Sequence, residues 1–186
     1  PFFEQFYDLW KVVPRPAKSI TTIYNSDYSN NAADLKNCYL VFNSSGSEDC
    51  AYGNAMSHCR NSFELSHCSQ LELSYQNFWA LNSARAFFCS QFAESTDIMF
   101  SKNMRGCNNC FGCVGLRGKS YCFFNEQLTK EEYQKRVARY DLGSYVVLKK
   151  ALAETRAFWG KFPVKYLEGM RNQNVSGGYI SLSKNV

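Results

Sequence analysis

The sequence predicts a mainly β protein: a right-handed parallel β-helix with about 21 residues per coil, an N-terminal capping helix and a C-terminal helical hairpin insertion. Three observations lead to this fold class. Small, amide and bulky residues recur in register when residues 38–121 are written in rows of about 21. Apolar residues follow helical spacing only in the two flanks. The 186 residues, 16% of them aromatic, supply enough apolar material for one domain with a buried core.

Residues 1–16 are predicted to form a helix that caps the coils. Pro1 suits the start of a helix. The open end of a solenoid exposes an unpaired strand edge that invites aggregation, so a cap is expected there and this helix is the candidate. Its apolar residues share one helical face: Phe2, Phe3, Phe6, Leu9, Trp10 and Val13.

Residues 17–128 are predicted to form the stacked coils. Neighbouring coils lie roughly 4.8 Å apart, so like residues sit above like residues. A narrow interior suits small apolar thiols, and a turn suits Asn, whose backbone tolerates the left-handed region. An antiparallel β-sandwich is the rival fold, but the clean alternation and Asn-Gly turns that favour it are missing. The predicted structural ladders are Cys38, Cys59, Cys68, Cys89, Cys110 and Cys122, with Asn61, Asn82 and Asn103.

Residues 129–162 are predicted to form a helical hairpin insertion. Thr129 and Glu132 match the pattern of a capping box, and Ser144 can cap a second helix. Basic residues lie mostly off the apolar stripes and form either a solvated face or a surface for an anionic partner. They are Lys135, Arg136, Arg139, Lys149, Lys150 and Arg156.

Residues 163–186 are predicted to return to the β-helix coil. The stretch NVSGGYISLSKNV (174–186) resembles YNSDYSNNAADLKNC (24–38), which indicates that the coil pattern resumes after the insertion. The chain is then expected to be a piece of a longer protein.

The stretch CNNCFGCVGLRGKSYC (107–122) is the candidate metal site. Thiolates are soft ligands, and Cys107, Cys110 and Cys113, with Cys122 as a fourth, could hold zinc or an iron–sulfur cluster. Cysteine recurs along the rows rather than in one place, which favours a packing role. We therefore expect no cofactor, with zinc or iron–sulfur at these four thiols as the alternative.

Two catalytic arrangements are weak candidates, and no catalytic residue is assigned. A glycosidase or lyase needs two carboxylates about 5–10 Å apart. Rows of about 21 residues place Glu72 and Glu94 within one coil of each other. The two histidines, His58 and His67, each precede a cysteine, but adjacent residues on a strand point to opposite faces. The candidate acids are Glu64, Glu72, Glu94 and Asp97.

Charge and composition limit the class of partner and the compartment. The net charge of +5 comes from residues 126–186, and it is too sparse for a generally basic nucleic-acid-binding face. No run of apolar residues is long enough to cross a membrane. The start, PFFEQFYDLW, lacks the features of a signal peptide, and nine cysteines, an odd number, indicate mostly reduced thiols. These features predict a cytoplasmic protein.

Four stretches resemble a family of uncharacterised cysteine-rich bacterial repeat proteins: PFFEQF, NCYLVF with SEDCAYG, CNNCFGCVGLRGKSYCFFNEQLTKEEY, and SGGYISLSKN. The resemblance covers most of the chain. It implies a β-helix that a zinc-binding CxxC region usually precedes, and it implies no established activity. Ala80, Ser101 and Val186 stand where such proteins usually have Cys, and the loss of single thiols suits packing better than metal binding.

The sequence therefore predicts a non-enzymatic β-solenoid that binds or organises an unknown macromolecular partner. The alternatives are a polysaccharide-acting β-helix enzyme and a thiolate metal-binding protein built on the CxxCxxC cluster. Homo-oligomers through the solenoid ends are a further expectation, because an uncovered coil can pair with another chain.

Overall fold

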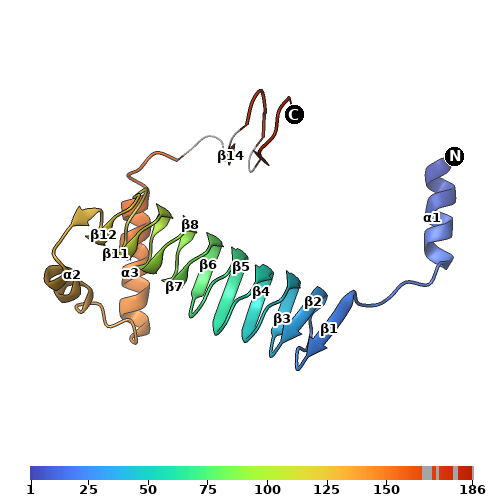
Figure 1. The fold of residues 1–186 in the computed structure, drawn as a ribbon, viewed down its shortest axis with the longest axis horizontal. Coiled ribbons are helices and arrows are strands. Elements are labelled where there is room, and N and C mark those ends of the chain that lie inside the picture. The colour runs from blue at the N-terminus through green and yellow to red at the C-terminus, as the bar shows by residue number, and fades with distance from the viewer. Residues whose placement is uncertain (165–168, 171, 178–179, 186) are drawn as a thin grey trace.

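The chain winds into a β-solenoid of about nine turns with helices at its ends, so the fold is mainly β as predicted (Figure 1). The structure is a computed structural model that describes residues 1–164, 169–170, 172–177 and 180–185. Every strand pairing between successive coils is parallel. The right-handed sense of the winding stays a prediction.

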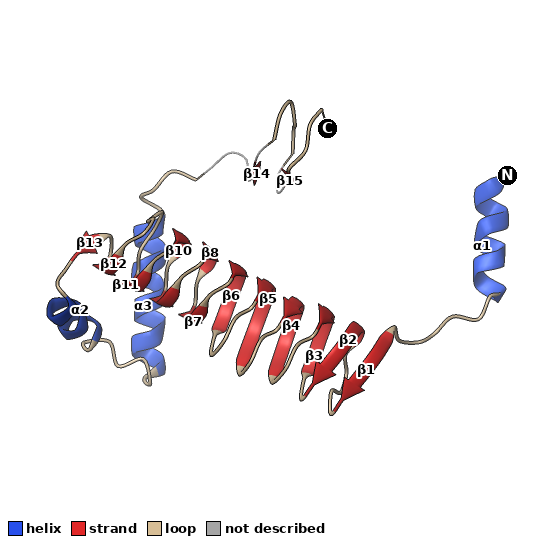
Figure 2. Cartoon of the chain, in the orientation of Figure 1, coloured by secondary structure: helices blue, strands red, loops and turns tan. Residues whose placement is uncertain are grey.

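Short strands build the solenoid, and the helices of the described residues flank it (Figure 2). The second helix starts at the predicted capping box, where Thr129 Oγ1 accepts from the Glu132 N–H at 3.2 Å and a Glu132 carboxylate oxygen accepts from the Thr129 N–H at 3.2 Å. Ser144 precedes the third helix without a side-chain capping bond. In chain order the elements are α1 (Phe2–Val12), β1 (Ile20–Tyr24), β2 (Asn30–Lys36), β3 (Tyr39–Ser45), β4 (Cys50–Ser57), β5 (Ser62–Ser69), β6 (Tyr75–Leu81), β7 (Ala84–Phe87), β8 (Ser90–Ala93), β9 (Thr96–Met99), β10 (Lys102–Arg105), β11 (Asn108–Phe111), β12 (Ser120–Phe123), β13 (Glu126–Gln127), α2 (Lys130–Val137), α3 (Tyr145–Trp159), β14 (Gly169–Met170) and β15 (Ile180–Ser181).

Each coil contains 12 residues, so the predicted length of about 21 is wrong. Strand partners such as Ile20 and Ala32, or Cys110 and Cys122, differ by 12 in residue number. Hydrogen bonds at the turns agree with this spacing. The Asn37 N–H donates at 3.0 Å to the carbonyl oxygen of Tyr24, the residue before Asn25, which lies 12 residues before Asn37. The coil is therefore a small closed loop with few interior positions.

A three-residue rhythm underlies the coil. From Thr22 to Phe124 every third residue has a left-handed backbone, with φ of 50° at Thr22 and 55° at Asn103. From Ser26 to Cys113 the residue that follows each of these turns inward and is buried. A left-handed backbone costs roughly 1–2 kcal/mol for a residue with a Cβ, so contacts between coils must offset this cost at every corner.

The same rhythm explains the wrong coil length. Both 12 and about 21 are multiples of three, so rows of either length place interior residues in one column. Cys38 and Cys59 thus fall together in rows of about 21, and both are buried. In the structure they lie on different interior ladders, because only residues 12 apart are stacked.

Interior serines complete the hydrogen bonding of the coils. The Ser95 hydroxyl donates to the Ala93 carbonyl oxygen at 2.8 Å and accepts from the Cys107 N–H, one coil along, at 3.2 Å. Ser26, Ser44, Ser62, Ser74, Ser83 and Ser101 repeat this arrangement. Buried N–H groups without a partner are costly, so small hydrogen-bonding side chains are required at these positions.

The two ends of the solenoid differ. At the C-terminal end β13 pairs antiparallel with β12, and α2 and α3 pack around a cluster that includes Phe100, Phe111 and Tyr133. At the other end β1 is exposed along its whole length. No residue of α1 is buried, and Figure 1 shows α1 standing away from the coils on an extended segment. A helix thus forms within the predicted residues 1–16, but it does not cover the first coil, so the predicted cap is not observed.

The C-terminal segment contains a short parallel pairing outside the main sheet. β14 and β15 form a two-stranded sheet in which Gly169 pairs with Ile180, and the Asn174 amide donates to the Asn185 side chain at 3.2 Å. Of the predicted coil at 163–186, residues 165–168, 171, 178–179 and 186 lie outside the described residues. No helix among the described residues is long and apolar enough to cross a membrane.

The interior hydrogen bonds predict the effect of replacing Ser95. Ser95→Ala leaves the Cys107 N–H and the Ala93 carbonyl without this partner, and we expect it to lower the free energy of unfolding by about 1–3 kcal/mol. Ser95→Cys keeps a donor and an acceptor and should cost less. Urea unfolding measures both. Ser45→Ala, on the outer surface, is the control, with a change within about 0.5 kcal/mol. Equal stability of Ser95→Ala and wild type would contradict the role assigned to the hydroxyl.

Candidate functional site

All nine cysteines lie inside the solenoid as free thiols. They occupy four interior ladders rather than one continuous ladder, because the coil has four inward corners. Cys38, Cys50, Cys110 and Cys122 share one ladder; Cys59 and Cys107 share the second; Cys68 lies on the third; Cys89 and Cys113 share the fourth. Each is at most 3% exposed.

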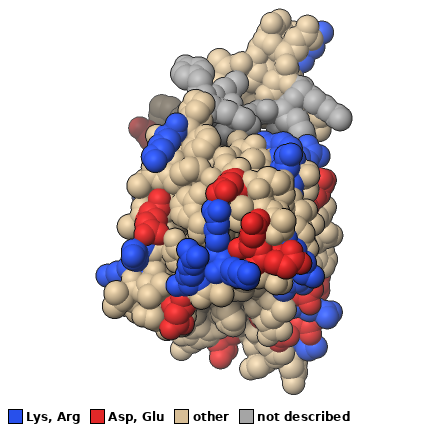
Figure 3. Space-filling view, turned by 90° about the vertical axis from the view of Figure 1, so that its left-hand side faces the viewer, with Lys and Arg blue, Asp and Glu red and all other residues tan. Residues whose placement is uncertain are grey.

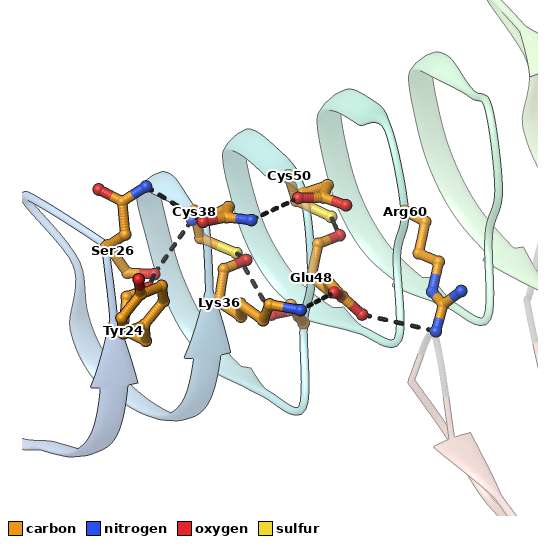
Figure 4. Close-up of polar contacts among 11 residues, drawn as sticks. Tyr24, Ser26, Lys36, Cys38, Glu48, Cys50 and Arg60 are labelled. Carbon is orange, nitrogen blue, oxygen red and sulfur yellow. Dashed lines mark hydrogen bonds and ion pairs between the residues drawn. The ribbon is translucent and has the colours of Figure 1, made fainter.

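The thiols take the hydrogen-bonding place that serine takes elsewhere in the interior. Cys38 Sγ donates toward the Lys36 carbonyl oxygen at 3.3 Å, and the Cys38 N–H donates to Ser26 Oγ at 3.0 Å (Figure 4). Cys89 Sγ accepts from the Ser101 N–H at 3.4 Å, as a serine hydroxyl does one ladder away. Cysteine and serine can therefore make the same kinds of hydrogen bond at these corners.

Burial holds several of these thiols in the protonated form. It raises the pKa of Cys68 and Cys89 to about 12 and that of Cys122 to about 11. Cys38 differs, because its interaction with the Cys50 side chain lowers the pKa of Cys38 while raising the pKa of Cys50. Cys38 is only 2% exposed, so the protein keeps reagents away from this thiol.

The candidate metal cluster does not converge on one point. Cys110 and Cys122 are stacked partners on one ladder, whereas Cys107 and Cys113 occupy two other corners. Each donates toward a backbone carbonyl two residues earlier, at 3.3–3.7 Å. No group of three or more His, Cys, Asp or Glu in the described part of the chain could hold a metal ion.

The predicted asparagine ladder is split over three corners. Asn61, Asn82 and Asn103 all have left-handed backbone, but 21 residues separate each from the next, so none stacks on another. Rows of about 21 residues therefore aligned left-handed residues that belong to different ladders. The amide ladders of the structure link residues about one coil apart: Asn25 with Asn37 and Asp49, and Asn31 with Asn43 and Asn54.

The candidate acids are dispersed, and the carboxylates of Glu64, Glu94 and Asp97 each have a partner about one coil away. Glu94 lies 3.5 Å from Arg105, and Asp97 accepts two bonds from Arg85 at 2.6 and 2.7 Å. Glu64 accepts from the Gln76 amide at 2.6 Å. Glu72 is bridged through its backbone to Arg60 and Ala84. Because the coil has 12 residues, the closeness expected of Glu72 and Glu94 fails: they lie almost two coils apart.

A surface trough lies along the solenoid. Its volume is about 700 Å³, and it runs over five or more coils along one outer face. One residue from each coil lines it at intervals of 12, and most of these residues are small: Thr21, Ala33, Ser45, Ser57, Ser69 and Leu81. Beside them Asn31, Asn43, Ala55, His67 and Trp79 form a second row. Sequence reasoning missed this site, although rows of 12 residues would have aligned both series.

Polar contacts order the trough. Ser57 Oγ lies 3.2 Å from Ser69 Oγ and 3.1 Å from His58 Nδ1. Asn31 Nδ2 donates to Asn43 Oδ1 at 2.7 Å. No Lys, Arg, Asp or Glu is among the residues that line it. A smaller hollow of about 310 Å³ adjoins it at Trp79 and Leu81, and there Glu94, Arg105 and Arg117 introduce charge.

The basic residues of α2 and α3 are partly neutralised. Arg136 forms a bidentate pair with Glu126 at 2.5 and 3.0 Å, and this pair lowers the pKa of the Glu126 carboxyl. Lys150 lies 3.9 Å from Glu154. Figure 3 shows Lys and Arg beside Asp and Glu on this end of the molecule. The observed pattern is typical of a solvated mixed-charge surface.

A scan against protein-family models gave no match, and a search of curated proteins gave none either. The resemblance to cysteine-rich bacterial repeat proteins therefore stays a prediction. The site must be interpreted from its own geometry.

The structural role of the thiols predicts the outcome of metal analysis. Protein purified from cells grown with added zinc and iron should contain no stoichiometric metal, because the four thiols of 107–122 point to three interior corners. Cys107→Ser should leave metal content unchanged and keep the β-type circular dichroism spectrum. One equivalent of zinc or iron that disappears in Cys107→Ser would instead establish a metal centre.

The raised thiol pKa values predict a loss of stability in alkali. Below about pH 9 these thiols are protonated in both folded and unfolded chains, so their contribution is intact. As pH rises from about 9 towards 12, the unfolded chain ionises first and the free energy of unfolding falls. Urea midpoints measured from neutral pH upward under reducing conditions should show this fall. The double variant Cys68→Ser, Cys89→Ser should show a shallower one; identical slopes would contradict the assignment.

Proposed function

We propose that this chain is a non-enzymatic β-solenoid that binds an extended, uncharged ligand along its surface trough. The observation that carries the proposal is the uncharged lining of a trough that spans successive coils. The ligand class that fits best is a neutral glycan chain. Its hydroxyl groups match the serine hydroxyls and asparagine amides, which recur at the coil spacing.

Trp79 suits such a ligand. It is 39% exposed at the point where the uncharged trough meets the charged hollow, so an aromatic surface stands at one end of the hydroxyl row. Aromatic rings offer a flat apolar surface with a polar edge, which fits the apolar face of a sugar ring. His67 lies 12 residues before Trp79 on the same row and adds a polar ring beside Ser66, at 2.9 Å from its hydroxyl.

The other predicted functions have weaker support. A polysaccharide-acting enzyme needs two acids free to act, whereas Glu94 and Asp97 are ion-paired and Glu64 accepts hydrogen bonds from Tyr75 and Gln76. An anionic partner at the basic helices would compete with the acids already present there. Pairing through the exposed edge of β1 remains part of the scaffold proposal, as does a reducing, cytoplasmic setting that would keep the thiols free.

Glycan binding tests the proposal. The full chain should bind neutral oligosaccharides on an array more tightly than acidic ones of the same length. Trp79→Ala should weaken the best neutral ligand by about tenfold or more, the equivalent of about 1.4 kcal/mol, measured by calorimetry.

Trp10→Ala is the matched control, because it removes the same ring from α1, outside the trough. It should leave glycan affinity unchanged. Binding that survives Trp79→Ala, or binding of acidic glycans that is lost in Arg139→Ala, would refute the trough as the ligand site.

A further inference from the structure

A continuous band of aromatic residues runs along the solenoid, but helices cover only one end of it. One ladder of stacked partners contains Tyr39, Ala51, Phe63, Tyr75, Phe87, Met99, Phe111 and Phe123. Rings are in contact from Tyr75 through Phe88, Phe100 and Phe111 to Phe123, with centroids 5.1–5.4 Å apart. Phe63 is the ladder partner of Tyr75, so the ladder joins this run of rings to the tyrosines nearer the N-terminus.

At the C-terminal end α3 shows what this surface accepts. Ala151 of α3 is fully buried against Phe100 and Phe111, and Leu148 and Leu152 pack on the same cluster. Phe158 contacts the Phe124 ring at a centroid distance of 5.1 Å. An amphipathic helix lying on the aromatic band is thus an established contact of this fold.

At the N-terminal end the same band is bare. We call this part the aromatic face. Its side chains are 42–64% exposed: Tyr28, Tyr39, Tyr52 and Phe63. Tyr28, Tyr39 and Tyr52 form their own ring contacts at 5.6 and 5.7 Å, which gives the face a fixed shape. Large exposed apolar patches of this kind mark interaction sites.

The chain also contains a helix, α1, whose apolar side is not buried by any described residue. On α1 the residues of the apolar face are 46–71% exposed: Phe2, Phe3, Phe6, Leu9, Trp10 and Val13. Eleven residues make a helix about 16 Å long, which matches about three coils at 4.8 Å each. The length and the aromatic character of α1 therefore fit the aromatic face.

The linker decides which chain provides the helix. Val13 is extended, with φ −76° and ψ 126°, and Pro14 and Pro16 follow, so the segment behaves as a stiff, extended spacer. Figure 1 shows it holding α1 well away from the coils of its own chain. A spacer of this kind disfavours folding back and favours reaching a neighbouring molecule.

We propose that the aromatic face is a homodimer interface that receives α1 of a second copy of this chain, laid on the band beside the position that α3 occupies. The exchange is reciprocal, so each copy contributes one helix and one face, as a two-fold interface requires. The trough and the solenoid ends take no part in it.

Light scattering with size-exclusion chromatography tests the full chain over a wide concentration range. The wild type should be a dimer. Trp10→Glu should be a monomer, because it places a carboxylate in the apolar side of α1. Val12→Glu is the matched control: it adds the same charge on the other side of the helix, where Val12 is 76% exposed, and should stay dimeric. A wild-type monomer at all concentrations would overturn the proposal.

Face variants and a mixing experiment separate this dimer from other associations. Tyr52→Glu and Phe63→Ser should each be monomeric while keeping the β-type circular dichroism spectrum. Mixing Trp10→Glu with Tyr52→Glu should restore a dimer, because the first keeps an intact face and the second an intact helix. A mixture that stays monomeric, a dimer that survives both face variants, or a monomer whose Trp10 fluorescence reports burial on its own chain would each reject the proposal.

Discussion

The backbone N–H of each interior residue is the constraint on which this fold depends. The other N–H groups of a coil bond to carbonyls of the neighbouring coils, as Asn37 does to Tyr24 and Lys36 to Ser47. The interior N–H points into the solenoid, where no water is available. In many coils the side chain stacked one coil earlier accepts from it, as Asn77 Oδ1 accepts from Cys89 at 2.9 Å. The interior is therefore selected for small hydrogen-bonding groups as well as for small volume.

This constraint gives the cysteines a structural explanation. A thiol is about the size of a hydroxyl-bearing side chain, donates weakly to a carbonyl and accepts weakly from an N–H. Cys113 does all of this, with Phe111 and Cys122 carbonyls at 3.3 Å and the Asn125 N–H at 3.4 Å. The thiol also adds apolar surface that a serine hydroxyl lacks. Alternation of Ser, Cys and Ala along one ladder follows from these shared properties, and no ligand is needed to account for it.

Much of the architecture was predictable from the sequence because its signals are local. The capping box of Thr129 and Glu132 needs only three residues of spacing, and stacked coils require only that like residues recur. The coil length was not recovered, because a three-residue rhythm aligns equally well at any multiple of three. Hydrogen-bond register decides between the multiples, and register depends on which corner lies above which. The trough escaped notice for the same reason, since Ser57 and Ser69 meet only in rows of 12.

With the interior committed to hydrogen bonding, functional variation is confined to the outward residues. Two of every three residues face outward, and each outward position recurs once per coil. The same type of residue can therefore occupy that position in successive coils and form a row. Polar small residues then make a trough, and aromatic residues make a band. The helices show how the band is used: α3 buries Ala151 on it, whereas α1 leaves Trp10 48% exposed, with only the Arg15 guanidinium over its ring among the described residues. The two ends of the solenoid differ: α2 and α3 cover one, and the other is open at β1. The exposed apolar surface is therefore concentrated near the open end, where a second molecule can reach it.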